Sequence, residues 1–330
     1  MSDAGASVGG AAETTIGRSG GAARFLLRRL AQALFVIAGV ACVTFFVLRL
    51  VPGDPARLMV PPGSSEEAVE AIRVKLGTNL PLLEQFATYV GGLLQGDLGT
   101  SFRYERPVLD LVLSVFPATL ALGGVAILFS VVVAVPLGIA AAAQPGRLID
   151  RFVLVLAMIG QSLPNFWIGV MLVLLLSIQL QWLPAIGNES AASYVLPVIT
   201  LSAVLVATLV RTVRQAMLEA LGEDYVRTAR AKGVPWSRIL FVHALKNAAI
   251  PLVTVLGLQI GFVLSGAFVV ELIFNWPGVG LLALQAIATR DFPVVQGVVI
   301  LVAAVFVLSN LLVDVAYAYL NPRIRLGVEQ

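Results

Sequence analysis

The chain has few charged and few reactive side chains. Charged residues make up 12% of its 330 residues, against roughly 25% in an average soluble domain. A single Cys and a single His leave no disulfide, no Cys/His metal cluster and no Cys/His catalytic pair. The only lysines are Lys75, Lys232 and Lys246, and none lies in the Gly-rich pattern that binds nucleotide phosphates. We therefore expect a non-catalytic chain that holds no metal or cofactor and does not hydrolyse ATP itself.

Long apolar runs dominate what is present. Hydrophobic residues make up 58% of the sequence, and the mean hydropathy is +0.93. A helix needs about 20 residues to cross the hydrocarbon core of a bilayer, and lipid leaves backbone groups no partners but their own. The predicted fold is therefore an all-α integral membrane protein with six transmembrane helices, near residues 26–50, 116–143, 152–180, 195–213, 248–272 and 294–319.

The positions of the 22 Lys and Arg residues predict the orientation. When the N-terminus is placed in the cytoplasm, most of them fall on the cytoplasmic side. Most of the others lie in one long connection, where the positive-inside rule counts least. Both termini and the loop 214–247 are therefore expected in the cytoplasm. The net charge of +3 then reflects topology, so we expect the lipid bilayer as a partner and no nucleic acid.

Composition divides the chain into five parts. The long outer connection contains amphipathic patterns that predict helices over 66–76 and 82–94. This outer cap is either a packing element or a docking surface or gate for an external partner. The parts are a disordered cytoplasmic tail 1–23, a first transmembrane helix 24–51, the extracytoplasmic helical region 52–115, a five-helix transmembrane core 116–320 and a cytoplasmic tail 321–330.

A compact basic segment lies inside the cytoplasmic loop. Tyr225, Val226 and Ala229 share one face of a predicted helix, and Gly233 suits the left-handed residue just past a helix end. Pro235 suits the first position of a following helix, in which Trp236, Ile239 and Leu240 would share a face. The pattern predicts a helix, a glycine corner and a second helix along the membrane face. It fits either an interfacial helix anchored on anionic lipid or a docking element.

Polar residues within the spans are costly in lipid and are therefore candidates for a substrate path. Hydrogen bonds between helices would account for most of them. Gln161 and Asn165 form an i, i+4 pair beside Pro164 that could line a cavity. Glu271, near the outer end of the fifth span, is either a gate element or, as we favour, part of a helix-end ion pair. The path candidates are Gln161, Asn165, Gln259, Ser265 and Glu271.

Within the basic segment, Arg227-Thr228-Ala229 followed by Gly233 resembles a loop motif whose general form is Glu-Ala-Ala, three residues, then Gly. Arg227 and Thr228 replace the Glu and the first Ala. His243 and Lys246 stand where the general motif continues with isoleucine and a Leu-Pro pair. The chain resembles the inner-membrane permease of a dipeptide/oligopeptide/nickel-type binding-protein-dependent ABC importer. The amino-acid sequence of residues 225–233 and 243–248 resembles that of the peptide subgroup.

Other sequence blocks agree with this resemblance over roughly residues 25–325. Each block is weak alone, and their order and spacing are together specific. The blocks are Gly53-Asp54-Pro55, Gly96-Asp97-Leu98-Gly99, Pro117-Ala118-Thr119-Leu120, Glu271 with Trp276-Pro277-Gly278, Ala286-Ile287 with Arg290-Asp291, and Asn321-Pro322-Arg323-Ile324-Arg325.

The resemblance implies a type I ABC importer permease in the bacterial inner (plasma) membrane that passes short peptides or a related small solute. It implies a second, homologous permease subunit, two cytoplasmic ABC ATPase subunits that carry ATP and Mg, and an extracytoplasmic substrate-binding protein. The residues expected to couple to the ATPase are Tyr225, Arg227, Thr228, Ala229, Arg230, Lys232, Gly233 and Val234.

The alternative function is an ion-coupled secondary transporter. Such a protein usually shows buried ionisable residues at mid-membrane and internal repeats. The span interiors here are nearly free of charge, and we find no repeat.

Overall fold

The computed structural model describes the backbone of residues 16–320, and the side chains of 27–312 except residue 264. The described chain is helical, with one isolated bridge between Thr100 and Pro107 and no β-strand. The predicted tail 321–330 and the first 15 residues of the predicted tail 1–23 lie outside the described residues. Helix α1 (Ile16–Leu50) begins within the predicted tail.

Five helical runs of the described chain are long and apolar enough to cross a membrane, or six if a bent pair counts as one span. This agrees with the predicted six-helix fold. The five runs involve α1, α5 (Val108–Ala143), α8 (Val195–Gly222), α11 (Leu245–Ile273) and α13 (Phe292–Leu320), and the bent pair begins with α6 (Leu148–Ser162).

The third predicted span, 152–180, is broken. Helix α6 ends at Ser162, and α7 (Asn165–Leu172) with the π-helical segment η1 (Val173–Gln179) leaves at 101° to it. Pro164 has no N–H to donate, and it favours the extended conformation that Leu163 adopts. Gln161 and Asn165 therefore lie on different helices and are not the i, i+4 pair of one continuous span, and their place in a cavity stays a prediction.

Two predicted spans also stop short of the observed helices. Helix α8 continues to Gly222, beyond the predicted end at residue 213. The second predicted helix of the cytoplasmic loop is not separate from the fifth predicted span. Residues 236–273 form one helical run of α10 (Trp236–Arg238), the π-helical η3 (Ile239–Ala244) and α11. Backbone bonding thus carries these helices past the apolar boundary from which the spans were predicted.

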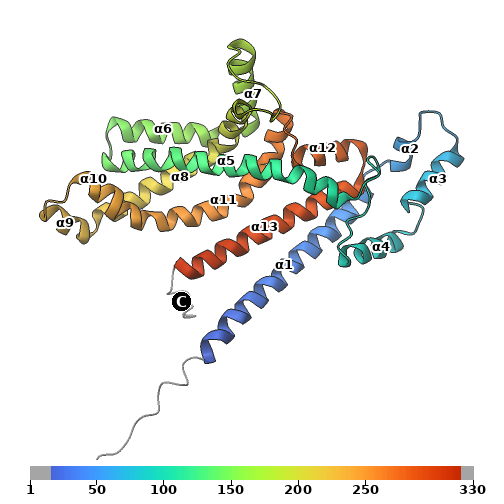
Figure 1. Cartoon of the computed structure of the whole chain (residues 1–330), viewed down its shortest axis with the longest axis horizontal. Helices are drawn as coiled ribbons and strands as arrows, with labels where there is room; N and C mark the ends of the chain where they lie inside the picture. Colours follow the sequence, from blue (N-terminus) through green and yellow to red (C-terminus); the bar gives the residue numbers. More distant parts are fainter. Residues whose placement is uncertain (1–15, 321–330) are drawn as a thin grey trace, which may run out of the picture.

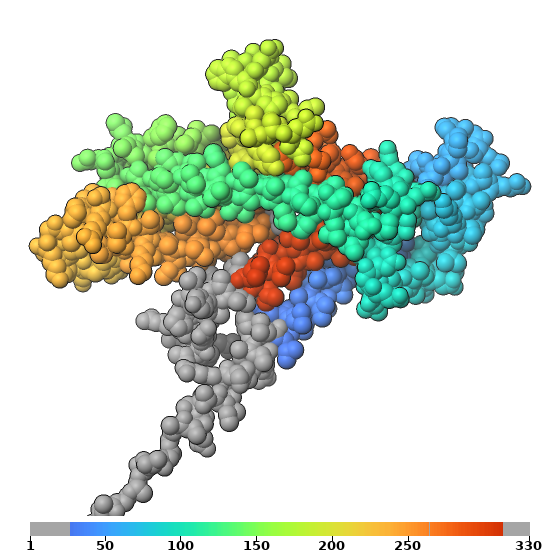
Figure 2. Space-filling view, in the orientation of Figure 1, coloured from blue at the N-terminus to red at the C-terminus, as the bar shows by residue number. Residues whose placement is uncertain are grey.

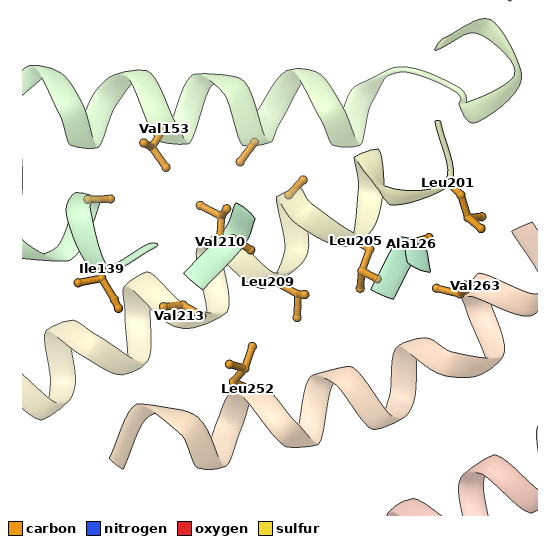
Figure 3. Close-up of a cluster of buried hydrophobic side chains, with 14 of the residues drawn as sticks. Ala126, Ile139, Val153, Leu201, Leu205, Leu209, Val210, Val213, Leu252 and Val263 are labelled. Atoms are coloured by element: carbon orange, nitrogen blue, oxygen red, sulfur yellow. The ribbon is translucent and has the colours of Figure 1, made fainter. Parts of the chain in front are cut away.

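Helix α8 is the centre of the bundle and packs against α5, α6, α7 and α11. Figure 3 shows Leu205 and Leu209 of α8 among side chains from α5, α6 and α11. In the most apolar stretch of each helix, 61% of the α8 residues are buried but only 11% of those of α1. Helix α1 packs mainly along α13 at the edge of the bundle (Figure 1).

The outer cap and the basic segment lie at opposite ends of the bundle (Figures 1 and 2). The cap contains α2 (Pro55–Met59), α3 (Glu66–Leu76) and α4 (Leu82–Leu94), and the last two confirm the predicted bounds. Ser65 caps the start of α3, and Gly77 ends it with a φ of 67°. Helix α9 (Asp224–Ala231) lies at the other end.

Replacing Gly138 by Ala tests the close contact of α5 with α8. An added Cβ would lie 2.7 Å from the Cβ of Val213 and 3.0 Å from the carbonyl oxygen of Val210. The control is Gly124→Ala on the same helix, where a Cβ would meet nothing within 4 Å. Both changes bring the same gain in helix propensity. We therefore expect the free energy of unfolding of Gly138→Ala to be about 1–3 kcal/mol lower than that of Gly124→Ala. Thermal unfolding in detergent measures the difference, and equal stabilities would contradict the close packing.

Candidate functional site

The predicted coupling segment, residues 224–234, ends in a hydrogen-bonded glycine corner. The N–H of Gly233 donates to the carbonyl oxygen of Arg230 at 2.9 Å, and the N–H of Val234 donates to that of Ala229 at 3.1 Å. With a φ of +74° at Gly233, this is the Schellman arrangement that closes a helix end. The predicted corner is confirmed. Pro235 is the N-cap of α10, one position before the predicted one.

Most of the predicted coupling residues are exposed, on α9 or in the corner that follows it. Val226 is buried, whereas Tyr225 is exposed and its hydroxyl accepts a hydrogen bond from Asn247 Nδ2 at 2.8 Å. The two residues lie on the predicted helix, but only Val226 is buried. Half-buried residues of the set are Ala229 and Val234, and the exposed ones are Tyr225, Arg227, Thr228, Arg230, Lys232 and Gly233.

An Arg–Trp contact spans the corner. The guanidinium carbon of Arg230 lies 4.3 Å from the ring centroid of Trp236, a cation–π distance. Ile239 is buried as predicted, but Trp236 is 37% exposed, so it contacts Arg230 instead of joining a wholly buried face. The stacked pair holds α9 and α10 together across Gly233.

A buried ion pair braces the helices that lead to this segment. Arg214 of α8 donates to both carboxylate oxygens of Asp150 at the start of α6, at 2.5 and 2.8 Å. The Gly146 N–H donates to Asp150 as well, at 2.8 Å, and the Asp150 side chain is 3% exposed. A fully bonded bidentate pair fixes two helices in register. Sequence reasoning missed this pair. The only local signal is one acid in the first turn of α6.

At the outer end, Glu271 is fully buried and holds the start of the short helix α12 (Val279–Thr289). Its carboxylate accepts from Thr119 Oγ1 at 2.6 Å and from the N–H groups of Gly280 and Leu281 at 2.6 and 3.2 Å. A carboxylate suits a helix N-terminus. Among the described residues no cation pairs with Glu271, so the predicted ion pair is wrong.

Two blocks far apart in sequence meet at this outer corner. Trp276 is fully buried and donates from Nε1 to the carbonyl oxygen of Ala118 at 3.0 Å. The N–H of Val279 donates to Thr119 Oγ1 at 2.9 Å. The sequence analysis did not predict α12, although the break at 276–278 followed by a short apolar run was a usable signal.

The other path candidates lie on two parts of the bundle. Gln161 is exposed at the end of α6, and Asn165 begins α7 with its Oδ1 buried and unpaired. Gln259 is half-buried on α11 and Ser265 is exposed on the same helix. No hydrogen bond joins any two of these four residues in the described chain. Their role in a path stays a prediction.

Three of the polar span residues do not form the predicted hydrogen bonds between helices. Ser162, Thr254 and Ser265 each donate to the carbonyl oxygen four residues earlier in their own helix, at 2.8, 3.1 and 3.0 Å. In lipid, this backbone oxygen is the nearest acceptor. These polar groups are thus satisfied without a partner helix.

The sequence matches two models of one transport family. Residues 134–326 match the binding-protein-dependent transport system inner membrane component, and residues 22–123 match its N-terminal part. The chain belongs to this family and is a multi-pass, inner-membrane permease subunit of an ABC importer.

Individual relatives cover nearly the whole chain. It is 42% identical over 301 residues to the glutathione transport system permease protein GsiC of Salmonella paratyphi A, covering 91% of this chain and 98% of the relative. It is 39% identical over 334 residues to the dipeptide transport system permease protein DppB of Escherichia coli K12, covering 92% and 98%. These relatives give no support to an ion-coupled secondary transporter.

Among solved structures, the inward-facing MetNI methionine ABC transporter has a TM-score of 0.53 at 20% identity. The match covers 67% of this chain and 98% of that one. This likeness supports the predicted type I importer permease fold.

Replacing Thr119 tests the outer corner. Thr119→Val removes the hydroxyl, which leaves a buried oxygen of Glu271 and the buried N–H of Val279 each without that partner. We expect a loss of about 1–3 kcal/mol in the free energy of unfolding, measured by thermal unfolding in detergent. Thr119→Ser keeps the hydroxyl and should lose less. A loss in Thr119→Val no larger than in Thr119→Ser would mean that the hydrogen bonds contribute no more to stability than the packing of the methyl group.

Proposed function

We propose that this chain forms the translocation path for short peptides or a closely related solute in an ATP-driven importer. The family supplies the importer class. The solute is inferred from relatives named for glutathione and dipeptide transport, which align over nearly their full length. Both solutes are small peptides with free carboxylates, and we propose that the solute of this importer has the same chemistry.

The partners we propose are a second, homologous permease subunit, two cytoplasmic ABC ATPase subunits and an extracytoplasmic substrate-binding protein. ATP and Mg bind the ATPase subunits, and this chain contributes no catalytic residue and binds no cofactor. Both termini and α9 then lie in the cytoplasm, and the cap lies outside. The separation of α9 from the cap by the length of the bundle supports this orientation (Figure 1).

The proposal that α9 couples the permease to the ATPase rests on the direct connection of α9 to the core. Only Glu223 separates α9 from α8, and α8 has 28 residues, a rigid rod of about 42 Å at 1.5 Å per residue. A helix docked in an ATPase groove would move with it as the ATPase subunits close. The displacement would pass along α8 to α5, α6 and α11, which pack around it.

The proposed solute path uses Gln259 and Ser265 of α11, with Gln161 and Asn165 at the α6–α7 bend. Asn165 has an unpaired buried oxygen that a passing donor would satisfy. Glu271, in contrast, is fully engaged in holding α12. We therefore assign it to the shape of the outer corner and not to solute contact.

Uptake into proteoliposomes tests the energy source. The reconstituted importer, with its binding protein outside, should accumulate radiolabelled alanyl-alanine when ATP and Mg are present on the ATPase side and no ion gradient exists. Omitting ATP or the binding protein should abolish uptake. Uptake driven by a proton or sodium gradient without ATP would contradict the proposal.

Replacing Gly233 tests the coupling segment. Gly233 has a φ of +74°, and an added Cβ would meet nothing within 4 Å, so Gly233→Val strains the backbone without a clash at the Cβ. A left-handed residue with a side chain costs about 1–2 kcal/mol, more for a branched one. We expect the corner to shift and the ATPase that co-purifies to fall about tenfold, with normal membrane insertion.

The matched control is Gly63→Val in the outer cap. Gly63 has a φ of +89° and likewise nothing within 4 Å of an added Cβ, so it carries the same backbone strain far from α9. It should leave ATPase co-purification unchanged. Equal co-purification in both variants would count against docking at the glycine corner.

A further inference from the structure

A cavity of about 580 Å³ lies between the cap and the bundle. Its walls come from the last turn of α1, from α3 and α4, from the loop 97–105 and from the first turns of α13. Figure 1 shows α1 ending and α13 beginning next to the cap. The volume lies within the roughly 300–1,000 Å³ of small-molecule pockets. The coupling segment and the path candidates of α6, α7 and α11 do not line this cavity.

Two buried polar groups in the cavity wall lack a hydrogen-bond partner in the described chain. Gln296 of α13 is 4% exposed, and its Nε2 is unpaired. The hydroxyl of Tyr89 on α4 is also buried and unpaired. Burial raises the pKa of Tyr89 to about 12, so the phenol keeps its proton and can donate. Buried groups of this kind are normally satisfied, so two of them in the wall of one cavity are available to donate to a bound acceptor.

A cation lies in the same wall. Arg49 of α1 is fixed by donating from Nε to Gln85 Oε1 at 2.9 Å and from Nη1 to the carbonyl oxygen of Phe45 at 3.2 Å. Its guanidinium carbon lies 3.3 Å from the ring centroid of Phe45, and Tyr89 stacks on the same ring at 5.2 Å. No carboxylate pairs with Arg49 among the described residues. The guanidinium is therefore held rigidly with its charge uncompensated.

The other charged groups of the cavity are already engaged. Lys75 pairs with Glu105 at 2.8 Å, with both side chains more than 60% exposed, and this pair holds the pKa of Glu105 below its usual value. Asp97 accepts the N–H of Gly99 at 2.8 Å. The remaining donors in the wall belong to Arg49, Tyr89 and Gln296, which come from α1, α4 and α13.

We propose that this cavity binds one anionic oxygen group, a carboxylate or a phosphate, on a small and partly apolar molecule. Arg49 supplies the charge, and Tyr89 and Gln296 supply further donors. Apolar wall residues hold the rest of the molecule, and they include Met59, Leu80, Leu98, Phe102 and Pro293. Two sources carry this chemistry: the carboxylate of a short peptide, and the phosphate of an anionic lipid at the extracytoplasmic surface of the same bilayer. The proposal does not depend on which solute the importer carries.

The experiment uses the complete importer in two arms. In nanodiscs of phosphatidylcholine without binding protein, it is titrated with a photoreactive dipeptide, alanyl-benzoylphenylalanine, and the cross-linked residues are mapped by mass spectrometry. In detergent with added phosphatidylglycerol, the retained lipid is counted by native mass spectrometry. Labelling of cavity residues such as Met59 or Phe102 would show that the bound anion is a peptide carboxylate. Retained lipid without such labelling would show that it is a lipid phosphate.

The variants are Arg49→Gln, Gln296→Leu and Tyr89→Phe, of which the last keeps the stack on Phe45. Each variant should weaken binding of whichever ligand, dipeptide or lipid, binds the unmodified importer. Arg49→Gln should weaken it by about tenfold, because it removes a charged donor. Arg57→Gln is the control, since Arg57 is an exposed cap residue outside the cavity wall. Binding in neither arm, or binding that Tyr89→Phe and Gln296→Leu weaken no more than Arg57→Gln, would overturn the proposal.

Discussion

Backbone groups inside a bilayer have no water to bond, so a helix can break there only where the protein supplies partners. The described chain breaks at two such places. Pro164 removes its own donor at the α6–α7 bend. At the α11–α12 corner the partners are side chains, because Glu271 and Thr119 accept the first N–H groups of α12. The short outer helix exists because one carboxylate is buried at its N-terminus.

Directional bonds also close the opposite end of the bundle, where most of α9 is exposed. The Gly233 corner pairs the last carbonyls of α9, and Asp150 takes both the Gly146 N–H and the guanidinium of Arg214. Between these two bonded ends, α8 contacts its neighbours through small and aliphatic side chains (Figure 3). Directional bonds thus fix the ends, whereas non-directional contacts fill the middle. That division suits the coupling proposed above, in which α8 would move as a rigid helix against non-directional contacts.

Sequence alone predicts the features that local chemistry determines. Helix α3 is predicted to the residue because Ser65 and Gly77 cap it, and the Gly233 corner follows from one glycine. The partner of Glu271 could not be predicted in this way, since Thr119 lies 152 residues away. The Asp150–Arg214 pair spans 64 residues and is hidden for the same reason. Composition predicts the spans, but only tertiary contacts decide where a polar side chain finds its partner.

The buried acids at the two ends of the bundle differ in what they bind. At the α9 end, Asp150 meets a cation, and both charges are neutralised. At the cap end, Glu271 accepts backbone N–H groups, and Asp291 accepts those of Phe102 and Arg103. These two outer acids therefore organise the backbone, and neither pairs with Arg49, which has no carboxylate partner among the described residues. A guanidinium that is fixed but uncompensated beside a cavity would be stabilised by an anion from outside the chain.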